Sequence, residues 1–277
     1  MLSVNDHNRD VTGMTYVYPV VSRRAGGVSI GINLNPNNAC NWACVYCQVP
    51  GLTRGGPPPV QLALLEAELR RFLREVTEGD FMVRYVPEEA RRLVDVAFSG
   101  NGEPTSAAAF HEAVLCLEKV LRDFALIDVI KVRLITNGSL LHRPEVCHGI
   151  ARIGALGGEV WFKVDRATLS GVEQVNGVKH PPERSRVNLL RCAELAATWV
   201  QTCWFALDAQ APDEQEQCAY LEYLLSVREH IQGVLLYGLA RPSLQPEAHR
   251  LSRLPAESFA YFRQRIEALG IPVVVSL

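Results

Sequence analysis

Residues 39–48 read Ala39-Cys-Asn-Trp-Ala-Cys-Val-Tyr-Cys-Gln48, and this stretch is the strongest guide to the structure of the whole chain. It holds Cys40, Cys44 and Cys47 in a C-x3-C-x2-C pattern, with Tyr46 directly before the last thiol. Three thiolates can bind three irons of a four-iron, four-sulfur cluster, which leaves the fourth iron without a protein ligand. That iron can bind a small molecule, so the pattern predicts a site of chemistry.

Two other interpretations of these cysteines are a zinc site completed by a distant histidine and three ordinary buried thiols. Zinc sites usually combine two close pairs of ligands that lie some distance apart in the sequence. The remaining cysteines form no second pair; they are Cys116, Cys147, Cys192, Cys203 and Cys218. The spacing therefore favours an iron–sulfur cluster.

The cysteine stretch resembles the cluster-binding loop of radical S-adenosylmethionine (SAM) enzymes. In that superfamily the amino and carboxylate groups of SAM bind the open iron, and reduction of the cluster cleaves SAM to a 5′-deoxyadenosyl radical. The resemblance implies a [4Fe-4S] cluster and S-adenosyl-L-methionine as cofactors, with Cys40, Cys44 and Cys47 as metal ligands and Tyr46 at the cofactor. Because the cofactors carry the radical chemistry, the protein positions the reagents.

Length and composition favour one large domain. With 277 residues, 48% of them hydrophobic, the chain can bury the core of one α/β barrel or of two small domains. The run Gly55-Gly-Pro-Pro-Pro59 follows the cysteines and is better explained as an exit into a helix than as a linker. We therefore expect a single domain over residues 1–277, with a cluster loop at 36–56 and an extension of the barrel at 255–277.

Composition also limits which cellular compartments and which binding partners fit this chain. The formal net charge of −2 gives no sign of a DNA partner. The stretch from Met1 to Asp10 lacks the order of a signal peptide, and no apolar run is long enough to span a bilayer. Of the eight cysteines, three are clustered and five lie at irregular intervals, which is not a disulfide framework. These features predict a cytoplasmic protein without a membrane partner.

Short apolar runs alternate with helical patterns along the chain, which is typical of parallel β/α units. Strands are expected at 28–34, 93–98, 131–135, 159–164, 200–207, 233–239 and 271–275, and helices at 60–78, 107–124, 144–153, 185–198, 214–230 and 256–269. The pattern predicts an α/β fold, a partial (β/α)6-type TIM-like barrel with parallel strands and outer helices. A doubly wound open sheet would produce a similar alternation, and the cysteine motif favours the barrel.

Polar motifs follow the expected strands one after another. After the cysteine stretch come Ser99 to Thr105, Thr136-Asn-Gly138, Asp165-Arg166, Asp208 and Arg241-Pro-Ser243. Active sites of barrels lie at the carboxyl ends of the strands, so these motifs are expected to meet around one site.

Two of these motifs resemble SAM-binding elements of the superfamily. Asn101-Gly102-Glu103-Pro104 resembles its Gly-Gly-Glu motif, in which the glycine allows close approach to SAM and Glu103 or nearby carbonyls accept hydrogen bonds from its ammonium group. Thr136 and Asn137 match a strand end that lies near the nucleoside of SAM. The alternatives are a strand-to-helix turn for the first motif and an Asn-Gly turn that caps a helix for the second.

Strand parity places Trp161, Lys163 and Asp165 on one face of the fourth strand. A buried lysine is costly without a partner or a task. Lys163 could bind a substrate anion, pair with Asp165 across the barrel, or act as an amine nucleophile with a lowered pKa. Asp165 could also bind the ribose hydroxyls of SAM. Arg241 could bind a carboxylate or phosphate in bidentate fashion, or lie on the surface before a proline turn.

The chain further resembles one branch of the superfamily, the Fe-S oxidoreductases related to wyosine-forming tRNA enzymes. The matching elements cover most of the chain and are Ser22-Arg23-Arg24, Ser29-x-Gly-Ile-Asn33, Tyr46-Cys-Gln48, Lys163-x-Asp165 and Tyr237-x-x-x-Arg241-Pro242. The wyosine enzymes carry a second cluster on cysteines before the SAM motif, whereas no cysteine precedes Cys40 here, which argues against their pyruvate-condensing reaction. No flavodoxin-like segment is fused, so an external electron donor of the flavodoxin or ferredoxin type is implied.

The resulting hypothesis is a radical SAM enzyme that abstracts hydrogen from an RNA base or a small metabolite. One alternative is a glycyl-radical-type activating enzyme that acts on a protein. Another is a non-catalytic Fe-S electron carrier or a metal-stabilised RNA-binding module, which would need the cysteines but not the polar strand ends. Fold and cofactor do not specify the substrate.

Overall fold

A curved eight-stranded sheet forms the centre of the protein in the computed structural model, which describes residues 13–22 and 26–277. The strands follow the order β1-β2-β5-β6-β7-β8-β10-β12. Their bounds are β1 Val17–Ser22, β2 Gly27–Ile32, β5 Leu93–Phe98, β6 Lys131–Thr136, β7 Glu159–Lys163, β8 Ala197–Cys203, β10 Gly233–Tyr237 and β12 Val273–Ser276. The Arg23-Arg24 pair and the stretch from Met1 to Asp10 lie outside the described residues.

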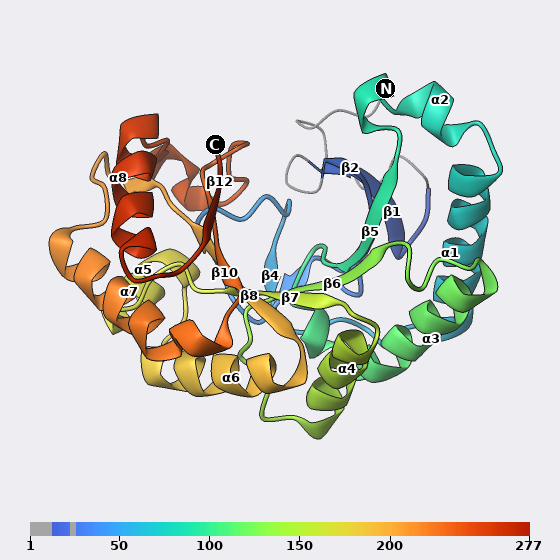
Figure 1. The fold of residues 1–277 in the computed structure, drawn as a ribbon, viewed down its shortest axis with the longest axis horizontal. Coiled ribbons are helices and arrows are strands. Elements are labelled where there is room, and N and C mark those ends of the chain that lie inside the picture. Colours follow the sequence, from blue (N-terminus) through green and yellow to red (C-terminus); the bar gives the residue numbers. More distant parts are fainter. Residues whose placement is uncertain (1–12, 23–25) are drawn as a thin grey trace.

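All neighbouring strands from β2 to β12 are parallel, and the sheet curls without its two edge strands pairing (Figure 1). The predicted partial barrel is therefore confirmed. Strand β1 differs from the expectation, because it runs antiparallel to β2. A short connection between two neighbouring strands can make only an antiparallel pair, and this edge strand was not predicted.

The helices lie outside the sheet and form an arc around its convex face (Figure 1). Their bounds are α1 Leu62–Thr77, α2 Phe81–Tyr85, α3 Phe110–Asp123, α4 Pro144–Ala155, α5 Leu169–Asn176, α6 Pro182–Leu195, α7 Glu214–Val227 and α8 Ala256–Glu267. Short 3-10 helices are η2 Glu88–Ala90, η3 Pro104–Ser106, η4 Arg228–His230 and η5 Pro246–Arg250, and two short strand pairs are β3 Ala39–Cys40 with β4 Thr53–Arg54 and β9 Ala206–Leu207 with β11 Leu251–Ser252. Across the ranges 13–22 and 26–277, no helix combines the length and apolar character needed to cross a bilayer.

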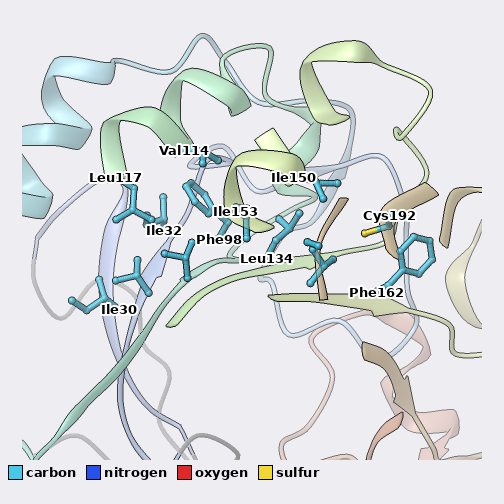
Figure 2. Close-up of a cluster of buried hydrophobic side chains, with 14 of the residues drawn as sticks. Ile30, Ile32, Phe98, Val114, Leu117, Leu134, Ile150, Ile153, Phe162 and Cys192 are labelled. Atoms are coloured by element: carbon cyan, nitrogen blue, oxygen red, sulfur yellow. The ribbon is translucent and has the colours of Figure 1, made fainter. Parts of the chain in front are cut away.

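Side chains on the convex face of the sheet build the hydrophobic core. Figure 2 shows Ile30 of β2, Phe98 of β5, Leu134 of β6 and Phe162 of β7, and all four are fully buried in the core cluster that also contains helix residues such as Val114 of α3. Burying one such side chain stabilises the fold by about 1.5–3 kcal/mol. The core therefore fixes the curvature of the sheet from its outer side.

The alternate residues of the same strands face the concave side, and many of them are polar. Ser29 of β2, Asp95 of β5, Arg133 of β6, Lys163 of β7 and Gln201 of β8 all line one cavity. Successive side chains of a strand point to opposite faces of the sheet, which explains this division. The concave side is therefore equipped to bind polar ligands.

Candidate active site

A cavity of about 350 Å³ opens on the concave side of the sheet, which is a volume suited to small molecules. Most residues proposed from the sequence line it: Cys40, Cys44, Tyr46, Cys47, Gly102, Glu103, Asn137, Lys163 and Arg241. Pro104, Thr136 and Asp165 do not line it but are buried beside residues that do. The carboxyl ends of several strands thus meet at one site, as parallel strands require.

The three clustered cysteines are half-buried. Burial raises the pKa of the Cys40 thiol to about 11 and that of the Cys44 thiol to about 12, so both must lose a proton when they bind a metal. Within the described part of the chain, no three His, Cys, Asp or Glu side chains converge on one metal ion. Each thiolate of a cubane cluster binds a different iron, so a cluster does not require the three sulfurs to converge on one metal ion.

The segment after β10 holds the backbone of the cluster loop, residues 36–56, in place. The carbonyl of Cys47 accepts hydrogen bonds from the backbone N–H of Leu244 (3.0 Å), the hydroxyl of Ser243 (3.1 Å) and the amide of Gln245 (3.1 Å). Ser243 also donates to the carbonyl of Val45 at 2.7 Å. Arg241 begins this segment, so the motif assigned to ligand binding also orders the third cysteine.

The carboxyl end of α5 holds the same loop from another side. The N–H groups of Ala43 and Val45 donate to the carbonyls of Asn176 (3.0 Å) and Val175 (2.9 Å). The side-chain amide of Asn176 donates to Cys44 Sγ at 3.2 Å. Gly177 ends the helix with φ 65°, and a Cβ there would lie 2.7 Å from the carbonyl oxygen of Ala43, so glycine is required for this close approach.

Gly102 packs directly against the start of the cluster loop. A Cβ at this position would lie 2.1 Å from the carbonyl oxygen of Ala39, so any larger residue would displace β3. The sequence predicts that Gly102 allows a close approach to SAM. The observed contact with Ala39 is a second reason why this residue must be small.

Glu103 joins the ends of β5 and β6. Its Oε1 accepts hydrogen bonds from the N–H (3.1 Å) and hydroxyl (2.6 Å) of Thr105 and from the hydroxyl of Thr136 (2.6 Å), and its Oε2 accepts one from the N–H of Asn137 (2.7 Å). Burial raises the pKa of this carboxyl despite these donors. The sequence analysis missed that the carboxylate is mostly occupied inside the protein, which leaves Oε2 with one free acceptor position.

Lys163 pairs with Asp165, which was one of its three predicted roles. Its Nζ lies 3.8 Å from Asp165 Oδ1, donates to the hydroxyl of Tyr237 at 3.0 Å and lies 4.9 Å from the centre of the Tyr46 ring. Burial alone would lower the pKa of this ammonium group, but the charge of Asp165 and the contact with Tyr237 outweigh burial, and the pKa is raised. These contacts favour a charged ammonium group over an amine nucleophile with a lowered pKa.

Asp165 is buried behind the residues that line the cavity, and its hydrogen bonds hold other site residues in place. Its Oδ2 accepts hydrogen bonds from the hydroxyl of Tyr46 (2.5 Å) and the amide of Asn176 (2.8 Å), and its Oδ1 accepts one from the N–H of Cys203 (2.9 Å). Because Tyr46 precedes the third cysteine, this carboxylate anchors the cluster loop to the end of β7.

A charged network deeper in the cavity was missed by the sequence analysis. Arg133 forms ion pairs with Asp95 and with Glu159, the latter at 2.6 Å, and its guanidinium lies 5.1 Å from the centre of the Trp161 ring. Ser29 donates to Asp95. The parity argument used for Lys163 applies equally to Asp95 and Arg133, so the signal was present in the expected strands.

Solved structures share this fold, among them a radical SAM methyltransferase, and the likeness confirms the predicted fold. One is a radical SAM methyltransferase from Sphaerobacter thermophilus, with 16% identity, a TM-score of 0.64 and coverage of 97% of this chain and 71% of that chain. TYW1 with a lysine–pyruvate adduct bound has 14% identity, a TM-score of 0.57 and coverage of 88% and 74%. Archaeal TYW1 has 16% identity, a TM-score of 0.52 and coverage of 87% and 71%.

Two curated proteins match parts of the sequence, and no family model matches it. The UPF0026 protein MJ1312 of Methanocaldococcus jannaschii is 34% identical over 152 residues, which are 53% of this chain and 39% of that protein. GTPase Obg of Brachyspira hyodysenteriae is 30% identical over 128 residues, 46% of this chain and 16% of that protein. The chain thus spans well under half the length of either relative.

Proposed function

We propose that this protein is a radical SAM enzyme that binds a [4Fe-4S] cluster through Cys40, Cys44 and Cys47. The observation that carries the proposal is that these cysteines line the same cavity as the polar ends of the neighbouring strands, in a fold shared with radical SAM enzymes. When bound, the cluster and SAM supply a 5′-deoxyadenosyl radical that abstracts a hydrogen atom from the substrate. A non-catalytic electron carrier would have no use for the polar strand ends.

The residues of the chain have separate tasks in this proposal. Gly102 and Asn137 line the cavity and contact SAM, while Glu103 keeps the ends of β5 and β6 together and offers its remaining acceptor position to an ammonium group. Tyr46 closes the wall beside the cysteines. Pro104, Thr136 and Asp165 shape the SAM site from behind, because each is buried beside a residue of the wall.

Lys163 and Arg241 contact the substrate in this proposal. Both line the cavity, and the pairing of Lys163 with Asp165 keeps its ammonium group charged. A protonated amine is a poor nucleophile, so we assign Lys163 to binding an anionic or polar group rather than to an adduct like the one named for TYW1. The substrate is a small metabolite or an RNA base that enters the cavity.

The proposal also requires a partner and a compartment. The electron comes from an external donor of the flavodoxin or ferredoxin type. The five cysteines outside the cluster loop lie at irregular intervals that are not typical of a disulfide framework, which supports a reducing compartment such as the cytoplasm.

The experiment that tests the proposal compares two triple variants after anaerobic reconstitution. The change of Cys40, Cys44 and Cys47 to Ala should abolish binding of about four irons per chain, because these three thiols have the ligand spacing and lie on one loop, whereas Cys203, which also lines the cavity, stands alone at the end of β8. The matched control changes Cys116, Cys147 and Cys218 to Ala, and this variant should keep the cluster.

Two further measurements on the wild-type protein separate the enzyme from an electron carrier. SAM should alter the electron paramagnetic resonance (EPR) signal of the reduced cluster, and dithionite should drive slow formation of 5′-deoxyadenosine. A cluster that survives the first triple variant, or a wild-type cluster that SAM never perturbs, would refute the proposal.

A further inference from the structure

Asn176 makes a side-chain contact with a sulfur of the three-cysteine group. This residue is 1% exposed at the end of α5, and its Nδ2 lies 3.2 Å from Cys44 Sγ and 2.8 Å from Asp165 Oδ2. A carboxylate and a thiolate both accept hydrogen bonds, so the amide must direct its two N–H bonds at these partners. The orientation of the amide is thereby determined by its surroundings.

The surroundings of Asn176 leave its amide little freedom to move. The backbone carbonyl of Asn176 accepts a hydrogen bond from the N–H of Ala43 at 3.0 Å. This bond connects the residue to the cluster loop on the amino side of Cys44. Its partner Asp165 is held in turn by the hydroxyl of Tyr46 and the N–H of Cys203. The distance from the amide to the sulfur is therefore set by the protein before any cluster binds.

A hydrogen bond to a ligand sulfur is one of the protein features that set the potential of an iron–sulfur cluster. Reduction places more negative charge on the cluster and its sulfurs, and a donor stabilises a more negative acceptor more strongly. We propose that Asn176 is a positioning residue that raises the reduction potential of the cluster by donating to Cys44 Sγ. This inference rests on the proposed function, because it needs the cluster at Cys44.

The test measures the midpoint potential of the reconstituted protein by an EPR-monitored redox titration. Asn176→Leu removes both N–H donors and keeps the branched shape and the number of heavy atoms of the side chain. The matched control is Asn188→Leu, because Asn188 is also buried but donates to the carbonyl of Gly138 at 2.8 Å instead of to a cysteine. We expect full iron content in both variants, with a more negative midpoint in Asn176→Leu alone. At the wild-type midpoint its ratio of reduced to oxidised cluster should fall by about twofold to tenfold, the range of one net hydrogen bond.

A second substitution keeps the test decisive if Leu prevents cluster binding. Asn176→Ser is smaller and too short to reach the sulfur, so it should hold the cluster and lower the midpoint in the same direction. Full iron content with an unchanged midpoint overturns the inference, and so does loss of iron in both variants, because Asn176 would then be only structural. A wild-type protein without a cluster overturns the proposed function together with this inference, whereas a wild-type cluster with an unshifted variant overturns this inference alone.

Discussion

Removal of the Glu103 carboxylate should destabilise the fold at the point where β5 meets β6. Glu103→Ala leaves four donors without their acceptor: two hydroxyls, which can rotate, and the backbone N–H groups of Thr105 and Asn137, which cannot. Each buried donor left unsatisfied costs about 1–3 kcal/mol, so the two N–H groups predict a loss of about 2–6 kcal/mol. Glu103→Gln can keep its oxygen at the Oε1 position, so only the N–H of Asn137 loses its acceptor. The predicted loss of stability is about 1–3 kcal/mol.

Urea unfolding followed by circular dichroism measures these losses. The control is Glu66→Gln. Like Glu103, Glu66 accepts hydrogen bonds, here from Arg70 and Lys119, but its side chain is 28% exposed. An exposed ion pair of this kind contributes about 0–1 kcal/mol. A loss below about 1 kcal/mol for Glu103→Ala, or equal losses for Glu103→Gln and Glu66→Gln, would refute the idea that Glu103 is a buried brace.

Two other substitutions test charges that the structure pairs. Lys163→Met should lower stability by about 3 kcal/mol, because it leaves the buried Asp165 without its cation. This value is the low end of the range for such a loss, since neutral donors still hold Asp165. Chemical unfolding measures the change, and a fully stable variant would contradict the pairing. Glu118→Gln tests acid stability, because Arg152, with help from Arg122, lowers the pKa of Glu118 from 4.5 to about 2. A lowered pKa stabilises the fold above the unfolded value, and this contribution is lost as pH falls from about 4.5 toward about 2. The unfolding temperature should therefore fall more steeply with decreasing pH in the wild type than in Glu118→Gln across that window. Parallel curves for the two proteins would contradict the assigned contribution of Glu118.

Local patterns were sufficient to predict most of the alternating strands and helices and many of the residues that line the cavity. The parity of β7 put Lys163 on the concave side, and the cysteine spacing located the cluster loop, because both features depend on neighbours in the sequence. The same parity would have found Asp95 and Arg133. The sheet curvature could be inferred only through the resemblance, since alternating strands and helices also build open sheets.

The contacts that order the cluster loop could not be predicted, because they join residues far apart in the sequence. Helix α5 is short and begins at the N-cap Thr168, whose side chain accepts from the N–H of Gly171, and its end contacts Cys44 from more than a hundred positions away. The direction of the Lys163 pKa shift also depended on distance, since desolvation and a nearby carboxylate act in opposite senses. Only the fold decides which of the two prevails.

If the proposed cluster binds, the hydrogen bonds to the Cys47 carbonyl affect how the protein loses and regains it. Three donors from residues 243–245 and two backbone bonds from α5 hold the backbone of the cluster loop through protein groups. We therefore expect that oxygen can strip the metal while the surrounding chain stays folded. Delivery of a fresh cluster by an assembly factor would then be a repair of the existing molecule, with no new synthesis and no refolding.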